Sequence, residues 1–129
     1  MPTSLMIEGM AQTSGILVGA VREFKEKVIL AKINQAAFER LVRPGEQIVY
    51  RATISQLNET GASIAGRVIS RTWHGGTPVE VAVGTVDLMF SHIDQNMSGM
   101  KFPDFNFVFN SQFMELFALY RRDLNLSLP

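Results

Sequence analysis

Residues 1–17 read Met-Pro-Thr-Ser-Leu-Met-Ile-Glu-Gly-Met-Ala-Gln-Thr-Ser-Gly-Ile-Leu, and Glu8 is the only charged residue among them. Helical spacing places Glu8, Ala11, Gln12 and Gly15 on one stripe, while leucine, methionine and isoleucine cover much of the remaining surface. A carboxyl group in apolar surroundings holds its proton more readily than one in water, so it can act as a general acid. The stretch therefore predicts a long, mostly apolar helix that carries one acid.

Glu8 also has a simpler interpretation, as an acid near the start of a helix. Thr3 or Ser4 can act as the N-cap, and the helix dipole stabilises negative charge in the first turns. Spacing alone leaves both interpretations open.

The same stretch resembles the central helix of the 3-hydroxyacyl-(acyl carrier protein) dehydratases of the hot-dog fold, whose usual run is Met-Pro-Gly-Val-Leu-Ile-Leu-Glu-Ala-Met-Ala-Gln-Ala-Ala-Gly. Residues 35–47, Gln-Ala-Ala-Phe-Glu-Arg-Leu-Val-Arg-Pro-Gly-Glu-Gln, are similar to that family's Lys-Ala-Arg-Phe-Arg-Arg-Pro-Val-Val-Pro-Gly-Asp-Gln. Two blocks in the same order are more specific than one short motif. The resemblance runs from Met1 to roughly Asp94, and it implies an α+β hot-dog fold in which an antiparallel sheet wraps a long central helix.

The resemblance also implies a site and an activity. In that family a histidine of one subunit takes a proton from C2 of a 3-hydroxyacyl thioester, and the helix acid of the other subunit protonates the departing hydroxyl. Glu8 matches that acid and Gln12 matches the motif glutamine, so both are the expected catalytic residues. Thr3 stands where the family has a glycine whose backbone amide binds the thioester carbonyl, and we expect Ala11 and Gly15 to line the substrate.

The implied substrate is an acyl thioester carried by acyl carrier protein or coenzyme A, with no cofactor and no metal. The implied assembly is a homodimer or a higher multiple of dimers, with acyl tunnels along the interface. His74 and His92 are too far apart in the sequence to suggest a metal-ligand cluster.

Two departures from the family pattern affect the chemistry. The family histidine lies in a His-Phe-Pro-Gly segment upstream of the Met-Pro pair with which the given sequence begins, and neither His74 nor His92 matches it. We therefore expect the base to be missing, unless the reading frame is longer. Thr3 replaces the glycine, and its β-branch narrows the approach of substrate. The predicted function is a dehydratase-like protein of fatty-acid biosynthesis, with a non-dehydrating acyl-thioester-binding protein or a thioesterase as alternatives.

Composition favours one globular domain and excludes other classes. The chain has 129 residues, a length typical of one domain. Its 12 basic and 12 acidic residues balance, so it lacks the net positive charge that favours binding to nucleic acid. The absence of cysteine excludes disulfides and fits a reducing compartment, so we expect a cytoplasmic protein. Glu8 and Gln12 interrupt the N-terminal apolar run, which argues against a signal peptide and a membrane span.

The pattern predicts a helix from Thr3 to about Phe24, followed by strands up to Asp94. We expect a strand at Val28–Ile33, a loop with one helical turn at Asn34–Leu41 that presents Phe38, and period-two strands joined by turns at Asn58–Gly61 and His74–Gly76. The period-two strands include the set Ile48, Tyr50, Ala52 and Ile54 and the set Ala62, Ile64, Gly66 and Val68, and the last strand runs over Val79–Ser91 with His92 after it.

Residues 95–129 are predicted to form an extension to the hot-dog domain of residues 1–94. Six of the nine phenylalanines lie between Lys101 and Leu119. A helix is expected from Asn110 or Ser111, after an irregular connector at Met97–Pro103, with an apolar stripe and two arginines at its C-terminal end. The stripe consists of Phe113, Leu116, Phe117 and Tyr120. This segment is expected to pack on the domain or on its dimer mate; the alternative is that it caps a tunnel mouth or docks a carrier.

Overall fold

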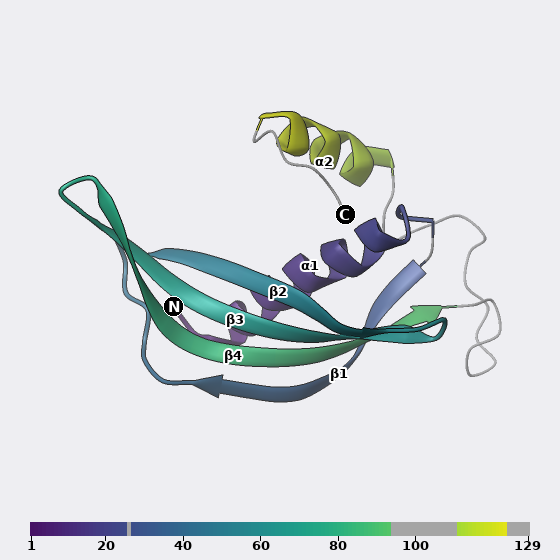
Figure 1. The fold of residues 1–129 in the computed structure, drawn as a ribbon, viewed down its shortest axis with the longest axis horizontal. Helices are drawn as coiled ribbons and strands as arrows, with labels where there is room; N and C mark the ends of the chain where they lie inside the picture. Colours follow the sequence, from purple (N-terminus) through teal and green to yellow (C-terminus); the bar gives the residue numbers. More distant parts are fainter. Residues whose placement is uncertain (26, 94–110, 124–129) are drawn as a thin grey trace.

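The computed structural model describes residues 1–25, 27–93 and 111–123. The elements are, in order, α1 (Thr3–Val21), β1 (Lys27–Phe38), β2 (Gln47–Leu57), β3 (Gly61–His74), β4 (Thr77–Ile93) and α2 (Ser111–Asp123). A curved antiparallel sheet wraps α1, and α2 lies beside the C-terminal half of that helix (Figure 1). The predicted α+β hot-dog arrangement is confirmed.

The helix α1 differs from the prediction at both ends. Its N-cap is Pro2, whose carbonyl accepts the amide hydrogens of Leu5 at 3.1 Å and Met6 at 3.4 Å, so neither Thr3 nor Ser4 caps it. It ends at Val21 and not at Phe24, because residues 23 and 24 adopt left-handed backbone angles with φ of 55° and 58°. This turn carries the Phe24 side chain back into the core, where it is 8% exposed.

One face of α1 packs against the sheet. Met6, Met10, Ser14 and Val18 recur every four residues and are fully buried. By length and hydropathy alone α1 is also long and apolar enough to cross a membrane. Its buried stripe against the sheet is the arrangement of the core helix of a globular domain.

The strand order is β1-β4-β3-β2. The strands β2, β3 and β4 form the predicted meander, and both predicted period-two sets face the core. The turns are also those predicted: Asn58 Oδ1 accepts hydrogen bonds from the Thr60 and Gly61 amides, and Gly75 and Gly76 have φ of 59° and 83°. β1 pairs with β4 and not with β2, the next strand along the chain. β1 and β2 therefore lie at opposite edges of the sheet, and residues 39–46 cross from one edge to the other.

Two expectations about strand limits were wrong. Asn34–Phe38 is not a loop with a helical turn but the second half of β1, which pairs with β4 up to Phe38 and Gly84. The sequence shows no strand pattern in this half because β1 lies at the edge of the sheet, where Ala31–Ala37 are exposed and buried residues do not alternate with exposed ones. Phe38 nevertheless packs against the core, as expected. His92 lies within β4, not after it.

The predicted C-terminal helix is present as α2, with Arg121 and Arg122 in its last turn. Two of the four predicted stripe residues pack against this domain, and packing of the other two on a dimer mate stays a prediction. Phe113 and Phe117 pack against the core, whereas Leu116 and Tyr120 are 68% and 60% exposed. The remaining residues of the expected connector and aromatic segment, including Asn110, Phe102, Phe105, Phe107 and Phe109, lie outside the described residues.

Candidate functional site

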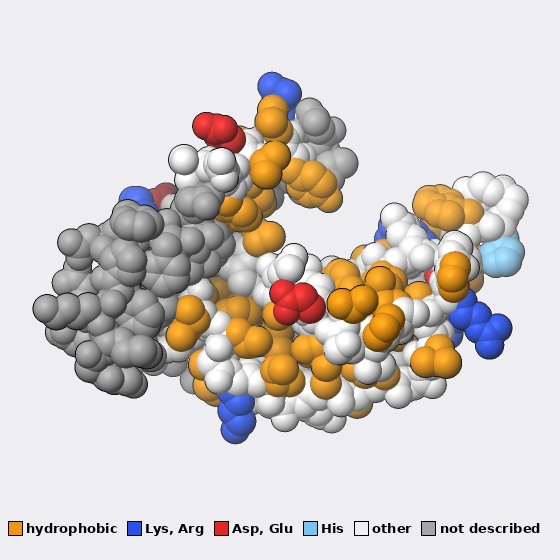
Figure 2. All heavy atoms as spheres, turned by 180° about the vertical axis from the view of Figure 1, so that it is seen from behind, with side chains coloured by type: hydrophobic (Ala, Val, Ile, Leu, Met, Phe, Trp, Pro, Cys, Tyr) orange, Lys and Arg blue, Asp and Glu red, His pale blue; other side chains and the backbone are white. Residues whose placement is uncertain are grey.

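A pocket of about 410 Å³ lies between α1, the first residues of β1, the end of β4 and α2. The helix α1 contributes Glu8, Ala11, Gln12, Gly15 and Ile16, and the other elements contribute Val28, Leu30, Phe90 and Phe113. We call this the Glu8 pocket. Figure 2 shows the hollow between α2 and the body of the domain, with apolar side chains along it.

The structure brings four of the five predicted site residues together. Glu8, Ala11, Gln12 and Gly15 line the pocket because helical spacing of three and four residues places them on one side of α1. Thr3 opens the helix and is not among the lining residues. Its backbone amide as a carbonyl donor stays a prediction.

Glu8 and Gln12 interact directly, one helical turn apart. Gln12 Nε2 donates a hydrogen bond of 3.1 Å to Glu8 Oε1, which fixes the carboxylate at one side of the pocket. Both side chains are exposed to solvent in the single chain, so Glu8 does not have the fully apolar surroundings that its sequence neighbours suggested. Among the described residues that line the pocket, Glu8 is the only charged one. The arrangement suits a ligand with an apolar chain and one polar group at the Glu8 end.

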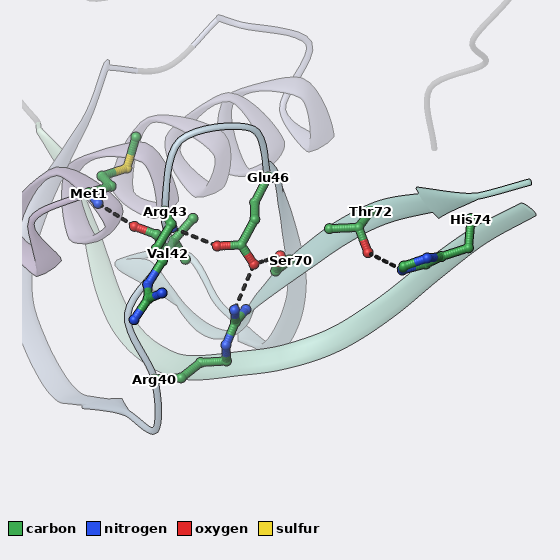
Figure 3. A network of polar contacts seen from close by, with 8 residues as sticks. All are labelled: Met1, Arg40, Val42, Arg43, Glu46, Ser70, Thr72 and His74. Carbon is green, nitrogen blue, oxygen red and sulfur yellow. Dashed lines mark hydrogen bonds and ion pairs between the residues drawn. The ribbon is translucent and has the colours of Figure 1, made fainter. Parts of the chain in front are cut away.

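Neither histidine lies in the Glu8 pocket. His74 ends β3 beside the glycine turn, where its ring lies 3.4 Å from Thr72 Oγ1 (Figure 3). His92 pairs across the sheet with Val28, beyond the point where Phe90 approaches Gly15. Val28 lines the pocket, but His92 itself is not among the lining residues.

Glu46 forms a polar network that the sequence did not reveal as such. Its Oε1 accepts hydrogen bonds from Arg40 Nη2 at 2.6 Å and Ser70 Oγ at 2.7 Å, and its Oε2 accepts one from the Arg43 amide at 2.6 Å (Figure 3). These bonds join the crossing segment 39–46 to β3. The Met1 nitrogen donates to the Val42 carbonyl, which holds the same segment beside the start of α1. The second sequence block thus positions the helix that carries Glu8.

The same contacts lower the pKa of Glu46 to about 2, chiefly through the Arg43 amide, and then through Ser70 and Arg40. A carboxylate with a lowered pKa stabilises the fold above its unfolded-state pKa, and this contribution is lost as pH falls through the folded-state value. We therefore expect the stability that Glu46 supplies to decline between about pH 4.5 and pH 2.

Glu46→Gln tests this network. The variant is expected to be less stable than the wild type at neutral pH, because the amide cannot reproduce the ion pair with Arg40, and the difference should shrink towards about pH 2. Urea unfolding along a pH series measures it, with Glu59→Gln in the exposed β2–β3 turn as a control. A difference that stays constant down to the lowest pH would contradict the assigned titration.

Curated relatives of this chain are dehydratases that match it over part of its length. The chain is 40% identical over 58 residues to the 3-hydroxyacyl-[acyl-carrier-protein] dehydratase FabZ of Caldanaerobacter subterraneus. This alignment covers 44% of this chain and 41% of that protein. The chain is also 28% identical over 98 residues to the FabZ of Chlamydia pneumoniae. This second alignment covers 74% of this chain and 59% of the relative. In the first of these alignments the match spans about two fifths of the relative's length.

Solved structures show the same fold at low identity. One is a hexameric broad-specificity acyl-coenzyme A thioesterase, with a TM-score of 0.66, 15% identity and coverage of 95% of this chain and 85% of the other. Another is a hexameric hot-dog fold thioesterase of Campylobacter jejuni, with a TM-score of 0.61, 15% identity and coverage of 90% and 81%. At such identity these structures support the fold alone.

The family assignment comes from the sequence profile. A profile of the FabA-like domain matches residues 1–79, which include α1 with Glu8 and the segment around Glu46. The match covers more than half of the chain, so this protein belongs to the FabA-like domain family.

Proposed function

We propose that the Glu8 pocket binds the acyl chain of a 3-hydroxyacyl thioester and that Glu8 is the acid of a dehydration. The observation that carries this proposal is the Glu8 pocket itself. Its described lining residues comprise one carboxylate, to which Gln12 donates a hydrogen bond of 3.1 Å, and side chains that are otherwise apolar or small. The FabZ relatives support the reaction class, since their name states a 3-hydroxyacyl-[acyl-carrier-protein] dehydratase.

The reaction divides into two proton transfers. A base removes a proton from C2, next to the thioester carbonyl, and the Glu8 carboxyl protonates the hydroxyl that leaves C3 as water. The product is a trans-2-enoyl thioester. Among the described residues no histidine lies beside Glu8, so we propose that a group outside this pocket supplies the base. Gln12 orients the Glu8 carboxyl group, and Ala11 and Gly15 leave room for the acyl chain.

We also propose that the protein acts as a homodimer or a multiple of dimers. β1 is an edge strand whose Leu30 and Ile33 are 40% and 44% exposed, and Leu30 also lines the Glu8 pocket. A second β1 on this edge would satisfy its backbone groups and cover these side chains. Light scattering should give at least twice the mass of one chain, and a stable monomer would contradict this assembly. A cytoplasmic location and a carrier protein or coenzyme A as the thioester carrier complete the proposal.

A product assay separates this function from its alternatives. The 129-residue polypeptide is mixed with 3-hydroxyoctanoyl pantetheine, and enoyl absorbance and free thiol are followed together. Because no histidine among the described residues lines the pocket, we expect substrate binding with measurable enoyl formation that is slower than the lower end of enzymatic rates, about 1 per second, and no thiol release. Thiol release without enoyl absorbance would establish a thioesterase. Binding without either product would favour the non-dehydrating alternative.

A further inference from the structure

α2 is attached to the hot-dog domain through an aromatic cluster. Phe113 and Phe117 of α2 stack on one another with ring centroids 5.7 Å apart and an interplanar angle of 11°. Each ring also meets Phe24 edge-on, with centroids at 5.6 Å and 5.1 Å respectively. Edge-to-face and offset-stacked geometries at these separations are the favourable ones for aromatic pairs.

Phe24 is a firm anchor for this cluster. It is 8% exposed and belongs to the hydrophobic core. Its amide donates a 2.8 Å hydrogen bond to the carbonyl of Gly19 in the last turn of α1, which fixes the backbone that carries the ring. The two α2 rings are therefore held against the C-terminal end of α1.

The two α2 phenylalanines differ in one respect. Phe113 lines the Glu8 pocket, whereas Phe117 does not. The lining residues of α1 run from Glu8 to Ile16, which is about 12 Å along the helix at 1.5 Å per residue. Glu8 lies towards the N-terminal end of this run, and Phe113, through its contact with Phe24, lies towards the C-terminal end. An acyl chain whose C3 hydroxyl meets Glu8 would thus extend along α1 towards the Phe113 ring.

We propose that Phe113 is a specificity-determining residue that forms the end wall of the Glu8 pocket and limits the length of the acyl chain. This inference rests on the proposed function, because it requires an acyl chain that starts at Glu8. The wall is formed by a ring that the aromatic cluster holds in place, so a chain that reaches it must bend away or displace α2. The extension that carries α2 thereby has a role in substrate choice.

Chain-length preference tests this role. Dissociation constants are measured by calorimetry for butanoyl, octanoyl and dodecanoyl pantetheine with the wild type and with Phe113→Ala. The variant is expected to improve binding of the dodecanoyl compound relative to the octanoyl compound by at least about tenfold, because removal of the ring opens the end of the pocket. Phe113→Trp should act in the opposite direction and weaken the octanoyl compound relative to the butanoyl compound.

Phe117→Ala is the matched control. It removes a ring from the same cluster but not from the pocket wall, so the relative affinities should stay within about twofold of the wild type. Unchanged preferences in both Phe113 variants would overturn the proposal, and so would equal changes in Phe113→Ala and Phe117→Ala, which would assign the effect to loosened α2. No binding of any acyl compound by the wild type would instead contradict the proposed function and this inference with it.

Discussion

Glu8→Gln is expected to remove the dehydration activity of the Glu8 pocket when a base is supplied. Glutamine keeps the shape of the side chain and its place beside Gln12 but has no proton to give to the leaving hydroxyl. Imidazole in the buffer can act as this base, since no histidine among the described residues lines the pocket. Loss of a general acid lowers a rate by roughly 10² to 10⁴. We expect a decrease of this size in imidazole-dependent enoyl formation.

Glu115→Gln is the control for this experiment, since it removes an exposed carboxylate of α2 that does not line the pocket. Circular dichroism of all three proteins checks that they fold equally. Equal imidazole-dependent rates for Glu8→Gln and the wild type would assign Glu8 to stabilisation of the first turns of α1, the simpler interpretation of its position.

Gly9→Ala is expected to destabilise the protein, although alanine is the better helix former. A Cβ atom on Gly9 would overlap the ring of Tyr50 on β2. Overpacking of this kind costs about 1 to 3 kcal/mol, and the gain in helix propensity returns about 1 kcal/mol. We expect a net loss of up to about 2 kcal/mol in the free energy of unfolding, measured by urea denaturation.

Gly15→Ala provides the comparison within the same helix. Its Cβ atom would lie 3.5 Å from Phe90 Cε1, an ordinary contact, so this variant should be more stable than the wild type by up to about 1 kcal/mol. Replacing Tyr50 by leucine should make Gly9→Ala less costly, as a double-mutant cycle would show. Equal stabilities of Gly9→Ala and Gly15→Ala would mean that α1 and β2 do not pack in the described register.

The departure at Gly9 illustrates what the sequence could and could not reveal. The dehydratase run has alanine at this position, and the sequence alone gave no reason for the glycine. The reason is the ring of Tyr50, which comes from a strand about forty residues later and reaches α1 only in the folded chain. A close approach between distant segments leaves no periodic signal.

The fold was predictable where one face of an element is buried. The period-two pattern of Ile48 to Ile54 and of Ala62 to Val68 predicted β2 and β3, because inward-facing side chains of these strands contact the core. β1 was only half predicted, because an edge strand with exposed residues on both faces shows no such pattern. Its place beside β4 depends on the crossing segment 39–46. Glu46 holds this segment to β3 through Ser70, which lies 24 residues later in the sequence, so no local pattern shows the contact.

The candidate site was predictable to the extent that it lies on one helix. Glu8, Ala11, Gln12 and Gly15 fall on one stripe by spacing alone, and they line one pocket. Leu30, Phe90 and Phe113 come from β1, β4 and α2, so only tertiary packing brings them to that stripe. The prediction of Phe113 as one of four equivalent stripe residues in α2 missed its separate role, because periodicity does not distinguish which ring reaches a pocket.

The most direct test of the central claim is whether filling the Glu8 pocket blocks acyl binding. Ala11→Phe places a large side chain inside the pocket, and Ala118→Phe places the same side chain on the exposed surface of α2. Calorimetric titration with octanoyl pantetheine should show saturable binding to the wild type and to Ala118→Phe, and binding to Ala11→Phe at least about tenfold weaker, which corresponds to about 1.4 kcal/mol. Equal affinity of Ala11→Phe and the wild type would show that the acyl chain binds elsewhere.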